Sequence, residues 1–136
     1  MTTLSSANDV LRRALALARS KPEEARTVLA AGLVEARRSG DPQGVAALAR
    51  HAALLCEQAN ALGEALAYYE EALQHEPDDA YLYYAVGNVR GTLGQRDSAR
   101  AAFLDSLELG RQQGDDDMIG IASNALAALD KATGER

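Results

Sequence analysis

The chain has 136 residues and a formal net charge of −6, and 47% of its residues are apolar although only 4% are aromatic. A length of about 100 to 150 residues fits one domain, so we expect residues 1–136 to form a single domain with a core of Ala, Leu and Val. The acidic balance argues against a nucleic-acid-binding surface, since neutralising phosphates requires a basic face, and an anionic membrane would repel such a chain.

The first segment of the chain lacks the order of a secretory signal. It reads MTTLSSANDVLRRALALA, with no basic residue before the apolar stretch and two arginines inside it. No apolar run approaches the roughly 18 residues of a membrane span. Cys56 is the only cysteine, so it cannot form an internal disulfide. These features predict a cytoplasmic protein with no role at a membrane.

Apolar residues recur at spacings of three and four through nearly the whole chain, which is the pattern of amphipathic helices. Strand-like alternation is absent from the sequence. The pattern is interrupted at residues 20–22, 40–42, 60–63, 76–79, 94–95 and 114–116. The sequence therefore predicts seven helices. Their connections are so short, about two to six residues, that neighbouring helices must run antiparallel.

Several interruptions carry residues that begin or end a helix. Ser20 and Glu23 have the spacing of a capping box around Pro22, and Asp41 precedes Pro42 at the next predicted helix. The left-handed conformation that ends a helix is available to Gly40, Gly94 and Gly114.

A small–large–small pattern recurs in the second helix of each predicted pair. The three copies are Ala25, Leu29 and Gly32; Ala65, Tyr69 and Ala72; and Ala99, Phe103 and Ser106. Because the internal spacing is identical in all three copies, we expect these residues to face the core.

The second and third copies are separated by 34 residues, and Pro77 stands where a repeat closes. Tyr83, Val86 and Gly87 follow in an aromatic, aliphatic, glycine order. With these residues the chain resembles the tetratricopeptide-repeat family. Arg90 departs from the family pattern, since it stands where a tyrosine is usual.

The resemblance implies an all-α fold, namely an α-solenoid of about three antiparallel helix pairs with a C-terminal capping helix. The expected repeats are residues 8–38, 43–76 and 79–112, and the capping helix is 116–132. Gly87 is expected where two helices approach closely. Tyr69 and Tyr83 are expected in the core on the grounds of periodicity.

In such a stack the first helix of each pair lines a concave groove, and this predicts a peptide-binding site on successive first helices. Tyr84 is expected to be an exposed apolar anchor, and a solvated helix face is the alternative explanation of the polar residues beside it. The predicted groove residues are Arg50, Leu54, Tyr81, Tyr84, Asn88 and Asn124.

One subset of the family binds C-terminal carboxylates through a basic and asparagine clamp. Only Asn88 matches a clamp asparagine here, because Leu54 and Ala128 occupy its counterparts in the neighbouring repeats. We therefore do not expect this chain to bind its ligand in that way.

Residues that could carry chemistry have simpler explanations. Cys56 lies on an inward stripe and reads as a small buried residue, while His51 and His75 belong to no metal signature. The aspartates at 115–117 suit a helix start. We therefore expect no enzyme activity, no cofactor and no metal.

The sequence favours a scaffold that binds a peptide segment of a partner protein. The alternative is an assembly module that forms a homo-oligomer or part of a larger regulatory complex through its terminal helices. Leu11, Leu15, Ile119 and Leu129 are the residues expected at such an interface. A small-molecule sensor would need a closed pocket, which three open helix pairs seldom provide.

Overall fold

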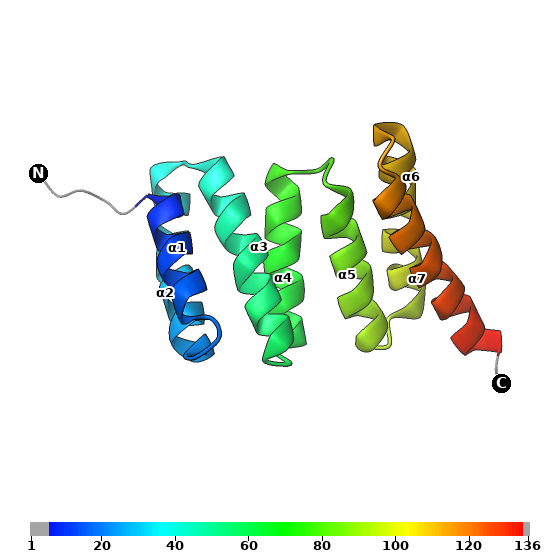
Figure 1. Cartoon of the computed structure of the whole chain (residues 1–136), viewed down its shortest axis with the longest axis horizontal. Coiled ribbons are helices and arrows are strands. Elements are labelled where there is room, and N and C mark those ends of the chain that lie inside the picture. Colours follow the sequence, from blue (N-terminus) through cyan, green and yellow to red (C-terminus); the bar gives the residue numbers. More distant parts are fainter. Residues whose placement is uncertain (1–5, 135–136) are drawn as a thin grey trace, which may run out of the picture. The chain divides into compact units, whose positions relative to one another are not determined.

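The computed structural model describes residues 6–134, and within this range it contains seven α-helices and no strand. This confirms the predicted all-α class and number of helices. The helices are α1 (Ala7–Leu17), α2 (Pro22–Ser39), α3 (Pro42–Gln58), α4 (Leu62–His75), α5 (Ala80–Thr92), α6 (Arg96–Gln113) and α7 (Asp116–Gly134) (Figure 1). None of the described helices combines the length and hydrophobicity that crossing a bilayer requires.

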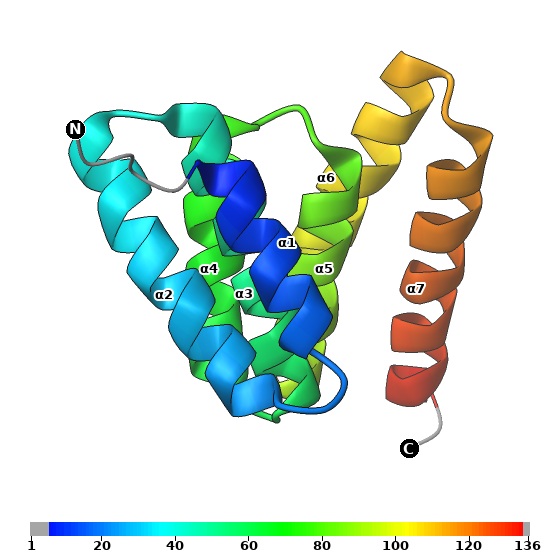
Figure 2. The ribbon, with the colours of Figure 1, turned by 60° about the vertical axis from the view of Figure 1, so that its left-hand side comes forward.

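Contacts divide the chain into two compact units, and each is described by itself. Unit 1 ends at Glu76 and contains α1 to α4, whereas unit 2 begins at Pro77 and contains α5 to α7. In unit 1, α1 packs against both α2 and α3, and it runs alongside α2 in Figure 2. Helix α3 also contacts both α2 and α4. In unit 2, α6 packs against α5 and α7, and α5 also reaches α7. Consecutive helices within each unit reverse direction.

Four helices end in the same way, with one residue in the left-handed conformation. The predicted glycines Gly40, Gly94 and Gly114 have φ values of 70°, 82° and 66°, and Asn60 joins them with a φ of 61°. In each case the N–H of the next residue bonds to the carbonyl five residues earlier, at 2.8 to 3.0 Å, which closes a Schellman turn. Asparagine tolerates this conformation better than most residues, which explains its place at the end of α3.

The small–large–small copies form the core of each unit, as predicted. Their large members Leu29, Tyr69 and Phe103 are buried, and so are the alanines that precede them. The Tyr69 hydroxyl is satisfied because it donates to Glu57 Oε1 at 2.7 Å. Buried Ser106 donates to the Ala80 carbonyl at 2.8 Å, so its polar atom is also paired.

The predicted capping box at the start of α2 is wrong. The residue before α2 is Lys21, and it makes no side-chain cap hydrogen bond. The Lys21 N–H bonds to the Leu17 carbonyl at 2.7 Å, so Ser20 is held within the turn that ends α1. It therefore lies one residue too early to cap α2. The corresponding prediction at α3 is confirmed, because Asp41 accepts from the Gly44 N–H at 3.0 Å.

Candidate binding site

Three aromatic rings form a continuous run in unit 2. The rings of Tyr81 and Tyr84 have centroids 6.0 Å apart, and Tyr84 lies at the same distance from Phe103. Tyr81 is 40% exposed and Phe103 is buried, while Tyr84 between them is half-buried. Tyr84 is therefore less exposed than expected, because its ring lies against Phe103, and its role as an anchor stays a prediction. Tyr83, expected in the core, is likewise half-buried.

Gly87 allows α5 to approach α6 closely, as the sequence predicts. A Cβ atom at this position would lie 2.5 Å from Cε1 of Phe103 and 2.6 Å from its Cδ1. The Phe103 ring thus occupies the space that any side chain at residue 87 would need.

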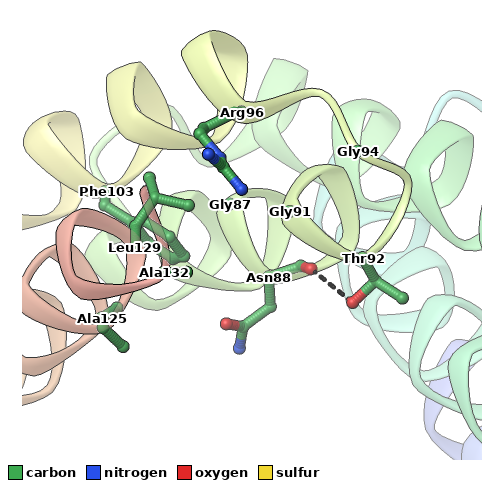
Figure 3. A pocket seen from close by; sticks show the side chains of 11 residues that line it. Gly87, Asn88, Gly91, Thr92, Gly94, Arg96, Phe103, Ala125, Leu129 and Ala132 are labelled. Atoms are coloured by element: carbon green, nitrogen blue, oxygen red, sulfur yellow. Dashed lines mark hydrogen bonds between the residues drawn. The ribbon is translucent and has the colours of Figure 1, made fainter. Parts of the chain in front are cut away.

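A cavity of about 610 Å³ lies in unit 2 beside this contact. We call it the α5–α7 cavity. Glycine and alanine make up much of its wall, and Asn88, Thr92 and Arg96 contribute polar side chains (Figure 3). The lining residues are Gly87, Asn88, Gly91 and Thr92 of α5, Gly94, Arg96 and Phe103, and Ala125, Ala128, Leu129 and Ala132 of α7.

Asn88 offers the cavity a side chain with both donors and acceptors. Its amide points into open space and makes no hydrogen bond to another described residue. The neighbouring Thr92 hydroxyl is already engaged, because it donates to the Asn88 carbonyl at 3.0 Å. Small side chains around one amide leave room for a peptide backbone to approach and to bond to it.

The predicted site residues of unit 1 both lie on α3, in different settings. Arg50 is half-buried, and its Nη2 lies 3.6 Å from Oε1 of Glu76, so its charge is already partly compensated. Leu54 is 40% exposed and lines a second cavity, of about 560 Å³. We call it the α1–α3 cavity. It is lined by Ala14, Leu15, Ala18, Arg19, Pro22, Glu23, Arg26, Leu29, His51, Leu54, Leu55, Gln58 and Ala59.

The two cavities occupy equivalent positions in their units. Helices α2 and α6 both have 18 residues. Ala25 and Ala99, 74 residues apart, are both fully buried within them. The same offset relates Ala14 to Asn88, Leu29 to Phe103, Leu54 to Ala128 and Leu55 to Leu129, all of which line one or other cavity. The similar segments SGDP and QGDD, before α3 and α7, are the sequence signal of this relation.

The six predicted groove residues are thus divided between the units. Tyr81, Tyr84 and Asn88 share one face of α5, but of these only Asn88 lines the α5–α7 cavity. Asn124 is exposed on α7 and is not among the lining residues. Thr92 and Ala128 line this cavity on the helix faces that the sequence assigns to the groove, and Leu129, expected at an assembly interface, lines it as well. Gly91, Ala125 and Ala132 were missed by sequence reasoning, because nothing distinguishes them from ordinary helix-packing residues.

Cys56 is buried and free, as expected. Burial raises the pKa of its thiol, and a hydrogen bond from Arg26 only partly opposes this effect. A thiol with a raised pKa is a poor nucleophile at neutral pH.

His51 contacts the Ala47 carbonyl through Nδ1 at 3.0 Å. Among residues 6–134, no three His, Cys, Asp or Glu side chains are grouped closely enough to hold a metal ion.

No known family's sequence profile matches the chain, and no curated protein matches it either.

Proposed function

We propose that the chain is a protein–protein interaction module that binds a peptide segment of a partner. The observation that carries this proposal is the α5–α7 cavity, in which the amide of Asn88 stands among glycine and alanine walls. An amide can donate to one backbone carbonyl and accept from one backbone N–H, and small walls admit a main chain. Tyr81 provides an exposed ring on the same helix face.

The proposal includes the arrangement that the sequence suggests. The antiparallel helices and the common turns within each unit are compatible with a solenoid of the tetratricopeptide-repeat kind. A cytoplasmic location fits the free thiol of Cys56. The proposed role requires no catalysis and no cofactor.

A photo-crosslinking experiment tests this function. A photoreactive amino acid placed at Ala128 should crosslink to a polypeptide in an extract of the native host, and crosslinking should weaken when Asn88→Ala is added. The same group at Ser98, which is exposed on α6, is the matched control. Equal crosslinking from residues 128 and 98 would contradict the proposal.

Self-association is the second candidate, and two exposed apolar side chains favour it. Leu15 on α1 is 53% exposed and Ile121 on α7 is 40% exposed. Sedimentation velocity distinguishes the two functions. A peptide-binding module should sediment as a monomer, whereas an assembly module should form an oligomer that Leu15→Ser or Ile121→Ser disrupts.

A further inference from the structure

The α1–α3 cavity of unit 1 combines an apolar interior with charged groups at its edge. Leu15 and Leu54 are both substantially exposed there, and buried Leu29 contributes to the wall. The charged lining residues are Arg19, Arg26 and Glu23, so arginine predominates in this cavity although the whole chain has a net charge of −6. Leucine side chains that line a cavity and remain exposed are typical of ligand sites.

Arg26 lacks the partners that a half-buried arginine normally has. Its Nε atom is buried and has no hydrogen-bond partner among the described residues. Its guanidinium lies against the Cys56 thiol, which is a weak acceptor, and no described carboxylate is within ion-pair distance of it. An unpaired charge of this kind is unfavourable, and a carboxylate would relieve it.

Unit 2 contains an arginine equivalent to Arg26, and this arginine has an acidic partner. Arg100 stands 74 residues after Arg26, and it forms an ion pair with Asp130 of α7. The residue that corresponds to Asp130 in unit 1 is Cys56. The carboxylate that the chain itself supplies in unit 2 is therefore missing in unit 1, on the side where Arg26 lines a cavity.

We propose that the α1–α3 cavity binds a peptide segment that inserts one large apolar side chain between Leu15 and Leu54 and places an adjacent Asp or Glu carboxylate on Arg26. This inference rests on the proposed peptide-binding function and assigns that function a second site, with its own ligand chemistry. The site selects a side-chain carboxylate next to an aliphatic residue, and charge complementarity to the two arginines provides the selection.

The test is a titration followed by NMR, which observes the Arg26 Nε–H signal directly. The probes are acetyl-Gly-Leu-Asp-Gly-amide and its neutral counterpart acetyl-Gly-Leu-Asn-Gly-amide, each added to the full chain at up to about 10 mM, where weak binding is measurable. We expect the acidic peptide to shift the Arg26 Nε–H signal and the methyl signals of Leu15 and Leu54. The neutral peptide should bind at least about tenfold more weakly, since a hydrogen bond to a charged group is lost.

Variants of the two equivalent arginines provide matched controls. Arg26→Gln should weaken the acidic peptide at least about tenfold, and Arg26→Lys should restore part of the affinity, since it keeps the charge without the planar fork. Arg100→Gln, which alters the corresponding residue of unit 2, should leave binding unchanged. Thermal melting of each variant shows that it is folded.

Several results would overturn the inference. These are shifts that spare Arg26, equal binding of the two peptides, an unchanged affinity of Arg26→Gln, or no binding of the acidic peptide at the highest concentration. A dimer whose interface covers Arg26, detected by sedimentation velocity, would also overturn it, since the occupant would be a second copy of the chain. If the acidic peptide does not bind but crosslinking from residue 128 persists, only the proposed second site is wrong. If the chain binds no polypeptide at all, both the second site and the proposed function are wrong.

Discussion

Helices α3 and α7 occupy equivalent positions in their units. Helix α3 is buried on two sides, whereas the corresponding second side of α7 is exposed. Ala52, Ala53 and Cys56 of α3 are buried, because α4 packs against that face. At the corresponding positions of α7, Leu126 is half-buried and Ala127 and Asp130 are exposed. No described helix follows α7 to cover this face.

The same three-helix arrangement carries different surface chemistry in the two units. Two equivalent pairs, Ala25 with Ala99 and Leu29 with Phe103, are buried core residues in both units. The cavity residues change freely, since Ala14 corresponds to Asn88 and Leu54 to Ala128. The core residues therefore account for the common fold, and the cavity residues make the two surfaces chemically different.

Substitutions of the two glycines at close helix contacts should have the largest effect on stability. Gly87→Leu should lower the free energy of unfolding by about 1 to 3 kcal/mol, because the new side chain would collide with the Phe103 ring. Gly32→Leu should be similarly harmful in unit 1, where a Cβ atom would lie 2.5 Å from Val10 Cγ1. Chemical denaturation measures both effects.

Gly120 of α7 is the matched control for these two glycines. It has helical geometry, and a Cβ atom there would meet nothing within 4 Å. Gly120→Ala should therefore stabilise the protein by about 0.5 to 1 kcal/mol through helix propensity. A loss of stability at Gly120, or none at Gly87, would contradict the described packing.

A smaller effect is expected at Ser106, which replaces the alanine or glycine of the other two copies. Ser106→Ala should cost about 0.5 to 1.5 kcal/mol, since the buried hydrogen bond to the Ala80 carbonyl is lost. The midpoint of urea unfolding measures this change. An unchanged midpoint would mean that the bond between α5 and α6 contributes no net stability.

A still smaller effect is expected from the ion pair between α2 and α4. Arg37 donates to both carboxylate oxygens of Glu71, at 2.6 and 2.7 Å, and this bond lowers the pKa of Glu71 from its ordinary value of 4.5. A depressed pKa in the folded state stabilises the protein above the unfolded pKa, and this contribution is lost as the pH falls through the folded pKa.

Because both side chains are partly exposed, the contribution should be below about 1 kcal/mol. Glu71→Gln should therefore reduce stability slightly at pH 7, and the difference from the unmodified chain should shrink as the pH falls below about 4. Denaturation curves at several pH values provide the measurement. A difference that grows in acid would show that the sign of this linkage is wrong.

Much of the fold could be predicted because helical periodicity and turn residues are local signals. The breaks at Gly40, Gly94 and Gly114 and the close contact at Gly87 all follow from such signals. The capping box at Ser20 failed for a local reason too, since the turn after α1 extends one residue further than the spacing suggests.

The site was harder to predict, because it depends on which side chains meet between helices. Periodicity places Tyr84 on the predicted groove face, but it does not reveal that the Phe103 ring lies against it. It places Arg50 correctly on α3 and cannot show that Glu76 already compensates its charge. Arg26 was overlooked because a lone arginine in an amphipathic helix looks like a solvated residue.

A calorimetric titration tests whether Asn88 presents its amide to a peptide in the α5–α7 cavity. The polypeptide identified by crosslinking is titrated into the unmodified chain, into Asn88→Ala and into Ser98→Ala. We expect Asn88→Ala to weaken binding by about 1 kcal/mol or more with little change in melting temperature, and Ser98→Ala to bind normally. Equal affinity of all three chains would contradict it.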